Sequence, residues 1–535
     1  MGMFFSLAKM LHRSRGQRPP ASRRLLVEPL EDRLCPSYST IDLGTLGTAY
    51  TSSSASAVNA SGQVVGTSST AVSGYNHAFL WQNGVMSDLG TLGGNSSGAA
   101  DINDSWQIVG SAPPVGSSPR HAVLWQNGVI NDLGTLGGDS SAANAINNHG
   151  QIVGHSKTAA GGLGSFVWES GVMYDLDALL PANSGWVTQA LYGIDINDNK
   201  QIAGTGMFNG QQRAFLITDN DGTFANGGLT ITNLGALAGG SSGAAGINNL
   251  GQVVGSSSAG PAYAGNWHAV RFSGGAVTDL KTLVGNPTQG ENYSDAYAIN
   301  DAGQIVGNSS TTTWNVRHAF LWQNGKMTDL NKQLPRGSAW MLESASDING
   351  AGQIVGQGSI GGQSHGFLMV PGAALQAQSV STMAVTQTLG LAQVQPLVTE
   401  AIARWQAAGV DTSGLGNIQI QIANLGGTTL GLASGHTIWL VADPAGWSCF
   451  VDPTPHSDSE FSTRGNQGGE HRMDLLTVLE HELGHILGFD HDETGVMDDT
   501  LAAGSRRTPS AGNDTDWFAA VDVVFSEKSL KRWRW

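Results

Sequence analysis

Short apolar blocks, separated by glycine and polar turn residues, follow one another in a fixed order between residues 39 and 370. The phrase that recurs most clearly is Gly-Gln-Ile/Val-Val-Gly, with small departures in some units. Its glutamines are Gln63, Gln107, Gln151, Gln201, Gln252, Gln304 and Gln353, at intervals of 44, 44, 50, 51, 52 and 49 residues. Self-similarity at such a period indicates a repeat architecture of seven units.

Each unit predicts four short strands. Ala-x-x-Ile-Asn leads through a polar turn into Gln-Ile-Val-Gly, and His-Ala-Phe-Leu-Trp is followed by Val-Met-x-Asp-Leu. Asn-Gly joins the second pair, as at Asn83-Gly84 and Asn324-Gly325, and this dipeptide is preferred in type I′ hairpins. Four strands with a period of 44–52 residues are typical of a propeller blade. We therefore predict an all-β propeller of about seven four-stranded blades over residues 39–370.

The two ends of this array predict how the ring closes. The last unit finishes at His365–Met369 without a fourth strand, whereas Thr40–Gly44 supplies a spare strand before the first unit. Pairing these two segments would close the ring and leave fewer exposed strand edges. The histidine of the His-Ala-Phe phrase is absent from two units, where Ser165 and Arg213 stand instead, so we expect it to be a polar strand-start residue that packs on the next blade.

Beyond residue 370 the pattern becomes a mixture of helix and strand. Residues 371–388 are rich in Ala, Gln, Ser and Thr and are interpreted as a linker. Val394–Ala408 has helical spacing, with a proline in its first turn, and Ile418–Ile422 alternates as a half-buried strand does. Thr437–Val441 predicts a second strand. A further helix is expected to begin near Asp474, a good N-cap.

That helix carries the segment with the most chemical information. His481 and His485 stand four residues apart, which places them on one helix face with about 5–6 Å between Cβ atoms. This spacing suits one zinc ion, for which the Zn–N distance is about 2.0–2.1 Å. Glu482 is placed to take a proton from a metal-bound water. Gly488 can adopt positive φ, end the helix and bring His491 back as a third ligand, leaving a fourth position for water.

The full phrase His-Glu-Leu-Gly-His-Ile-Leu-Gly-Phe-Asp-His, with a methionine downstream, resembles the metzincin clan of zinc endopeptidases and most of all its matrixin-like branch. The resemblance implies that His481, His485 and His491 bind a catalytic Zn²⁺ and that Glu482 is the general base. It also implies that Met497 is the Met-turn residue below the site. Residues 389–505 are then expected to form a small α+β metalloprotease domain that cleaves protein or peptide substrates.

Two other segments of this region are candidates for binding. Domains of this kind pair an edge strand with an extended substrate, and Trp447–Val451 is our candidate for that edge. His456, Asp458 and Glu460 form a polar cluster before the helix. We interpret the cluster as a solvated loop. A second, structural ion at this place is the alternative. In the repeat array, Asp219-Asn220-Asp221-Gly222 resembles a calcium loop but lacks the downstream Glu, so the sequence does not support Ca²⁺ there.

The other resemblances concern location. The repeat phrases are similar to the HAF family of extracellular repeats, and Arg23–Leu34 resembles the LEPR-type N-terminal motif of exported bacterial proteins. Residues 1–38 form a basic arm for export or targeting, and residues 506–535 form a C-terminal tail. These resemblances imply an extracellular or cell-surface protein, whose propeller binds a ligand of the extracellular matrix or the surface.

Net charge, apolar run length and cysteine spacing argue against several classes of protein. The net charge of −16 argues against a nucleic-acid partner, because phosphate binding needs clustered Lys and Arg. No apolar run reaches the length of about 18 residues that a membrane span needs. Cys35 and Cys449 lie far apart, so no disulfide framework is implied, and the surroundings of Cys35 do not match a thiol latch.

Three functions follow from these observations. The first is a zinc-dependent metalloendopeptidase that the propeller targets or scaffolds. The alternative is an extracellular or surface binding protein in which the propeller is the functional part and the protease domain is inactive. In a third, the zinc centre hydrolyses a non-peptide amide. The sequence leaves the substrate, the propeller ligand, the latency mechanism and the oligomeric state open.

Overall fold

The computed structural model describes residues 38–48, 52–72, 74–116, 119–181, 184–187, 191–259, 266–284, 293–313, 316–334, 338–372, 374–378, 389–423, 425, 428–441, 448–458, 461, 472–489, 491 and 495–509. All of them belong to one compact unit, Pro36–Trp535. The N-terminal arm, Cys35 and most of the C-terminal tail lie outside the described residues. Among the described helices, none is both long and apolar enough to cross a membrane.

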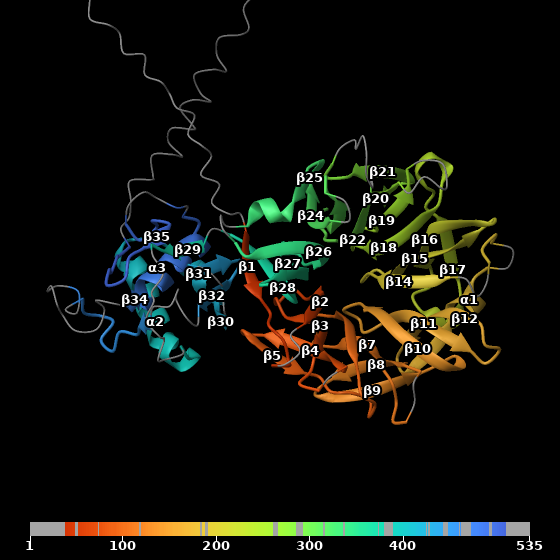
Figure 1. The fold of residues 1–535 in the computed structure, drawn as a ribbon, viewed down its shortest axis with the longest axis horizontal. Coiled ribbons are helices and arrows are strands. Elements are labelled where there is room, and N and C mark those ends of the chain that lie inside the picture. The colour runs from red at the N-terminus through yellow and green to blue at the C-terminus, as the bar shows by residue number, and fades with distance from the viewer. Residues whose placement is uncertain are drawn as a thin grey trace, which may run out of the picture. The chain divides into compact units, whose positions relative to one another are not determined.

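The repeat array forms seven four-stranded antiparallel sheets, one for each unit (Figure 1). The first blade has β2 (Ser53–Val58), β3 (Val64–Ser69), β4 (Asn76–Gln82) and β5 (Val85–Asp88), and the second has β6 (Gly98–Ile102), β7 (Ile108–Ala112), β8 (His121–Gln126) and β9 (Val129–Gly134). The third has β10 (Gly137–Ile146), β11 (Ile152–Thr158), β12 (Leu163–Glu169) and β13 (Val172–Asp175), and the fourth has β14 (Tyr192–Ile196), β15 (Gln201–Phe208), β16 (Gln211–Asp219) and β17 (Leu229–Asn233). The fifth has β18 (Ser242–Ile247), β19 (Val253–Ser258), β20 (Trp267–Ser273) and β21 (Ala276–Lys281), and the sixth has β22 (Ser294–Ile299), β23 (Ile305–Ser310), β24 (Arg317–Gln323) and β25 (Lys326–Asp329). The last has β26 (Trp340–Ile348), β27 (Ile354–Ile360), β28 (Gln363–Pro371) and β1 (Tyr38–Asp42). Short helical turns lie between strands at α1 (Leu176–Leu179), η1 (Phe224–Asn226), η2 (Leu237–Gly239) and η3 (Leu330–Gln333).

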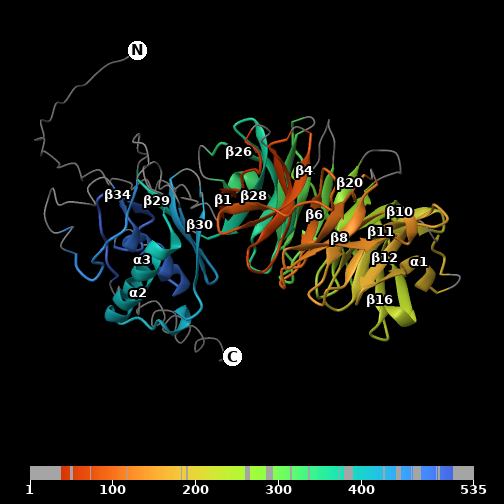
Figure 2. The same cartoon turned by 90° about the horizontal axis from the view of Figure 1, so that it is seen from below.

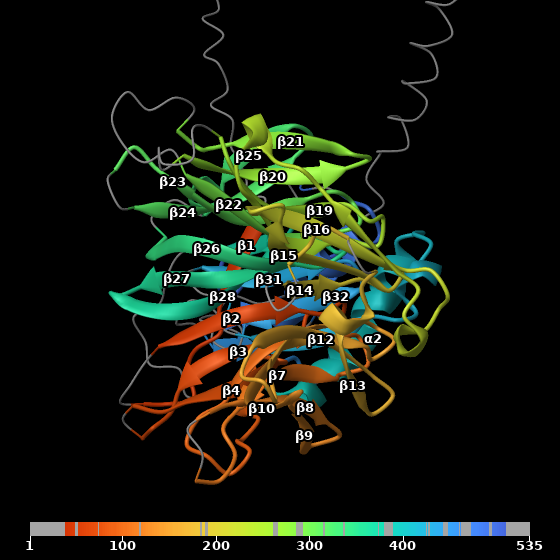
Figure 3. The ribbon, with the colours of Figure 1, turned by 90° about the vertical axis from the view of Figure 1, so that its right-hand side faces the viewer.

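The predicted ring closure is confirmed. Strand β1 pairs antiparallel with β28, from Tyr38 opposite Pro371 to Asp42 opposite Phe367. In Figures 1 and 3 this red N-terminal strand lies among the green strands of the last blade. The array is therefore a β-propeller whose final sheet is completed from the other end of the array, which leaves no blade with a missing strand.

A ring of asparagines explains why Asn and Gln recur in each unit. The Nδ2 atom of each of these asparagines donates to the backbone carbonyl of the equivalent asparagine in the next blade, over 2.9–3.3 Å. Its Oδ1 accepts from the backbone N–H of the glutamine four residues on. The members of this asparagine ring are Asn59, Asn103, Asn147, Asn197, Asn248, Asn300 and Asn349. The bond from Asn349 to Asn59 closes the circle across 290 residues of sequence.

The histidines of the His-Ala-Phe phrase have structural partners. In five blades the histidine Nδ1 bonds to an aspartate carboxylate on the adjacent strand at 2.7–3.1 Å. In the last blade this aspartate is Asp42, from the closing strand β1. These contacts lie within one blade, whereas a contact with the next blade was expected for this histidine.

The C-terminal region contains a mixed sheet and two longer helices. A five-stranded sheet has the order β30-β32-β31-β29-β35, and β33 and β34 form a separate pair. The strands are β29 (Ala374–Ala377), β30 (Gln419–Ala423), β31 (Thr429–Ser434), β32 (Thr437–Val441), β33 (Ser448–Phe450), β34 (Arg472–Asp474) and β35 (Thr500–Leu501). The helices are α2 (Leu391–Ala407), η4 (Ser413–Leu415) and α3 (Leu475–Ile486). Helices α2 and α3 contact each other, as Figure 2 shows.

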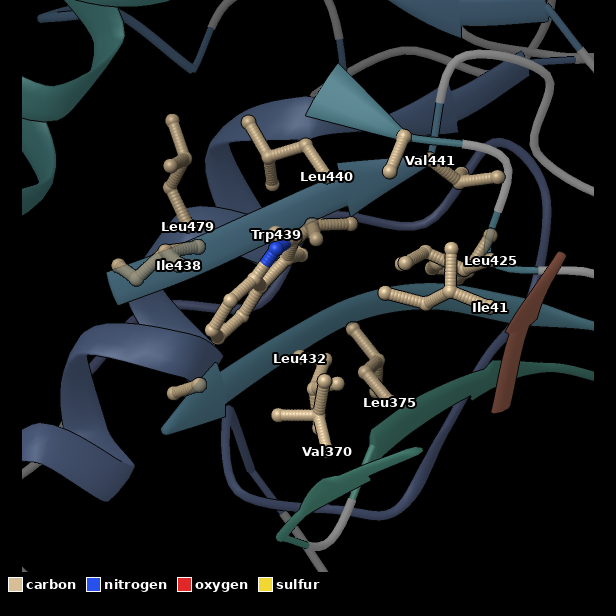
Figure 4. Packing of buried hydrophobic residues seen from close by; sticks show 14 of the residues in the cluster. Ile41, Val370, Leu375, Leu425, Leu432, Ile438, Trp439, Leu440, Val441 and Leu479 are labelled. Carbon is tan, nitrogen blue, oxygen red and sulfur yellow. The ribbon is translucent and has the colours of Figure 1, made fainter. Parts of the chain in front are cut away.

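Two expectations for this region were wrong. Residues 371–388 were interpreted wholly as linker, but Ala374–Ala377 is a strand of the main sheet. Its Leu375 is 1% exposed, because it packs into the same apolar cluster as Leu432 and Trp439 (Figure 4). The proposed substrate edge was also misplaced, since Ser448–Phe450 pairs with β34 and takes no part in the five-stranded sheet.

Candidate metal centre

Helix α3 begins and ends as its sequence predicts. The carboxylate of Asp474 accepts from the backbone N–H of Thr477 at 3.2 Å and from its hydroxyl at 2.7 Å, which caps the first turn. The helix ends at Ile486, and Gly488 follows with a φ of 92°. Only glycine adopts this conformation readily, so the chain can turn back at this point. Phe489 and His491 are thereby returned to the helix.

Three imidazoles converge at this turn. The Nε2 atoms of His481 and His485 are 3.0 Å apart, and both are 3.1 Å from Nε2 of His491. In the part of the chain that the structure describes, this is the one group of three or more His, Cys, Asp or Glu side chains close enough to share a metal ion. Three nitrogens at about 2.0–2.1 Å from a tetrahedral zinc would lie about 3.3–3.4 Å from each other. The cluster is close to that spacing.

Backbone carbonyls set the orientation of two of these rings. Nδ1 of His481 lies 2.8 Å from the carbonyl of Val496, and Nδ1 of His485 lies 2.9 Å from the carbonyl of Phe489. A carbonyl only accepts, so each Nδ1 carries the proton and each Nε2 presents a lone pair. Burial lowers the pKa of His481 well below its usual value, which keeps the ring neutral. Lone pairs that face one another repel, and a shared cation would remove this repulsion, so the residues present fit a bound zinc.

Met497 lies against α3 at Gly484. A Cβ atom built on Gly484 would come within 2.3 Å of the Met497 sulfur and 2.9 Å of the Trp405 ring. The ring of Trp405 stacks on Phe489 with 4.9 Å between centroids, and its Nε1 donates to the carbonyl of Glu480 at 2.8 Å. Gly484 therefore allows Met497 and Trp405 to approach the helix one residue before His485.

The Glu482 side chain lies against strand β31. It is fully buried, and a Cβ atom on Gly431 of β31 would lie 2.7 Å from its Oε1. The backbone N–H groups of Leu375 and Ala433 face the carboxylate, but neither makes a well-aligned hydrogen bond. Burial raises the pKa of Glu482 well above its usual value. The structure therefore brings the three histidines and Met497 together, and holds Glu482 between α3 and the sheet.

A buried ionic network that sequence reasoning missed supports α3. Arg506 bonds to the carboxylates of Asp474 and Asp452 at 2.7 Å, and both of these side chains are fully buried. Asp458 accepts from Arg506 and from Arg404, and these arginines outweigh burial and lower the pKa of Asp458. Arg404 also lies 3.4 Å from the buried Glu480. The sequence offered one indication of this network: Arg506 and Arg507 stand side by side downstream of the motif, in a chain with only 13% charged residues.

This network changes the interpretation of the polar cluster before the helix. Asp458 was interpreted as part of a solvated loop, with a second ion as the alternative. Its side chain is 49% exposed, and two arginines bind it. His456 is exposed, and Glu460 lies outside the described residues. Positive side chains therefore surround Asp458, which opposes binding of a cation there.

No protein-family model matches this chain, and no curated protein matches it. Among solved structures it is similar to TolB from Acinetobacter baumannii, with 10% identity and a TM-score of 0.30 over 49% of this chain and 63% of that one. It is also similar to a puromycin-hydrolyzing peptidase of Mycobacterium tuberculosis, with 11% identity and a TM-score of 0.38 over 60% and 52%. A gluconolactonase from Xanthomonas campestris gives 11% identity and a TM-score of 0.30 over 62% and 89%. The chain spans less than two thirds of the first two structures.

Proposed function

We propose that the C-terminal region is a zinc-dependent metalloendopeptidase of the metzincin type. The observation that carries this proposal is the convergence of three Nε2 atoms within 3.0–3.1 Å, two of them with the tautomer that a metal ligand needs. The extended His-Glu-Leu-Gly-His phrase supports the same reaction class, and the contact of Met497 with the ligand helix is compatible with it.

The chain's own residues would divide the chemistry as follows. His481, His485 and His491 hold the ion, and the carbonyls of Val496 and Phe489 keep two of the rings in place. When bound, the zinc would lower the pKa of a water towards about 7 and polarise the scissile carbonyl. The Glu482 carboxylate would take the proton of the attacking water and pass it to the leaving amine.

Glu482→Ala tests this proposal in the full chain. We expect the variant to keep one zinc per chain, because the three ligands are unchanged, and to lose cleavage of casein or gelatin. Glu343→Ala, in blade strand β26, is the matched control and should cleave as the wild type does. A hydroxamate should block the wild type. Cleavage by Glu482→Ala at the wild-type rate would show that Glu482 is not the general base. Assays with a panel of non-peptide amides distinguish a protease from another amidohydrolase.

A binding function of the propeller is the second candidate. A cavity of about 310 Å³ lies at the asparagine ring, and its lining includes Asp104, Asp198 and Asp301. The resemblance to HAF repeats and to exported proteins supports an extracellular or surface location for such a module. Zinc binding without cleavage of any peptide in the assay above would favour this candidate over the protease.

A further inference from the structure

Strand β29 is the element whose position the proposed protease does not explain. Strands β30, β31 and β32 follow one another in the chain and form three adjacent members of the sheet. Strand β29 comes from before α2, shortly after β28 ends at Pro371, and pairs with the remaining edge of β31. Its other edge pairs in parallel with the two-residue strand β35, with Gln376 opposite Thr500 and Ala377 opposite Leu501. It runs antiparallel to β31, with Ala374 opposite Leu432 and Leu375 opposite Gly431.

The same strand reaches the general base. Leu375 pairs with Gly431, and Gly431 is the residue whose missing Cβ leaves room for the Glu482 carboxylate. The N–H group of Leu375 faces that carboxylate. The Leu375 and Ala377 side chains are 1% and 5% exposed, and the N–H group of Ala377 donates to the carbonyl of Thr428 at 2.6 Å. In this arrangement Glu482 has no exposed surface.

An extended peptide that adds to a sheet edge gains affinity from main-chain hydrogen bonds, and alternate side chains enter pockets. Strand β29 has this geometry on β31. Because it is tethered, its effective concentration is about millimolar, far above that of a dilute substrate. From these contacts we infer that the β31 edge beside Glu482 is the substrate-binding strand, and that the chain's own Ala374–Ala377 segment occupies it in cis.

This inference rests on the proposed protease function and names its substrate site. The ligand class is an extended peptide with a large apolar side chain opposite Gly431 and a small residue two positions later, as Leu375 and Ala377 are. The segment therefore competes with substrate and must leave β31 before a substrate can pair there, so the activity of the wild type reflects the fraction of chains in which it has left. Its departure would also uncover Glu482 for the water that it must deprotonate.

The test uses the full chain and a fluorescein-labelled peptide of residues 371–380. Leu375→Asp places a charge in the apolar pocket, and Ala377→Pro removes the donor to Thr428, so either should release β29. Gln378→Ala, an exposed position next to the strand, is the control. We expect the two release variants to bind the peptide at least tenfold more tightly than the wild type and the control. Hydrolysis of a quenched peptide should rise by a similar factor.

Zinc content is measured in every variant, so that failure of the inference and failure of the protease assignment remain distinct. Tighter peptide binding by the release variants without any hydrolysis supports the inference and contradicts the protease. Full hydrolysis by the wild type, with no increase in the release variants, overturns the inference and leaves the protease intact.

Hydrogen exchange of the wild type needs no variant and covers the case in which both substitutions prevent folding. The amides of Leu375 and Ala377 should exchange at least a hundredfold faster than those of Ile438 and Leu440 on β32, because only the two-residue strand β35 holds the other edge of β29, so β29 can leave β31 before the rest of the sheet opens. Equal exchange of the two strands would show that β29 opens only with the whole sheet, and would refute occupancy in cis.

Discussion

Replacing Gly431 by alanine tests the contact between the sheet and the proposed general base. Gly431 lies in the middle of β31 without positive φ, so no backbone constraint requires glycine there. A Cβ atom at this position would meet Glu482 Oε1 at 2.7 Å, Val478 Cγ1 at 2.7 Å and Glu482 Cγ at 2.9 Å. Ordinary contacts of a Cβ begin near 3.4 Å. Glu482 and Val478 must therefore move by several tenths of an ångström, or the strand must.

The magnitude follows from two opposing effects. Overpacking of a well-filled core costs about 1–3 kcal/mol. Alanine restricts the conformations of the unfolded chain more than glycine does, which raises the free energy of unfolding by about 0.5–1 kcal/mol. The net loss of unfolding free energy should be about 1 kcal/mol. Activity should fall much further, since displacement of a catalytic group by about 1 Å costs on the order of 10²-fold in rate.

The assay combines urea unfolding with kcat/KM for a quenched peptide. The matched control is Gly416→Ala, because a Cβ there meets nothing within 4 Å and φ is −67°. This control should keep its activity and be unchanged or more stable by about 0.4–1 kcal/mol. The reasoning is refuted if Gly431→Ala behaves like the control in both measurements, because Glu482 would then not lie against β31.

Three further predictions concern metal, charge and pH. A free zinc concentration one hundredfold above the Kd should raise the free energy of unfolding of the wild type by about 2.7 kcal/mol. Calorimetry should show no such increase for His491→Ala and the full increase for the exposed His456→Ala. Arg506→Met leaves two buried carboxylates without their arginine and should lower the free energy of unfolding in urea by about 3–5 kcal/mol. A decrease below about 1 kcal/mol would show that this ionic network does not stabilise the fold. Burial raises the pKa of Asp195 to about 7. Between about pH 4 and pH 7 this carboxyl is therefore protonated in the folded state and ionised in the unfolded state. The free energy of unfolding should fall as pH rises through this range, by up to about 1.4 kcal/mol per pH unit. Asp195→Asn should make this slope shallower, and an unchanged slope in urea titrations would speak against it.

Local pattern was enough to predict the repeat array. The Asn-Gly hairpins, the number of blades and the completion of the last blade by an N-terminal strand all follow from short motifs and their period. That strand was predicted at Thr40–Gly44 and lies at Tyr38–Asp42. The sequence predicts these features because each blade repeats the same contacts with its neighbour, such as those of the asparagine ring, and therefore the same residues. The N-cap at Asp474, the turn at Gly488 and the grouping of the three histidines are equally local, since all lie within 18 residues.

Tertiary packing alone decided the surroundings of that motif. Ala374–Ala377 is an unremarkable Ala/Gln/Leu stretch in sequence, and becomes a strand only because the free edge of β31 and an apolar pocket accept it. Arg506 finds Asp452 and Asp474 across 54 and 32 residues. Glu482 adjoins His481 in sequence, yet the helix turns it towards Gly431 and Leu375. A motif specifies which side chains share a helix, whereas the partners of each side chain depend on which distant strand covers that face.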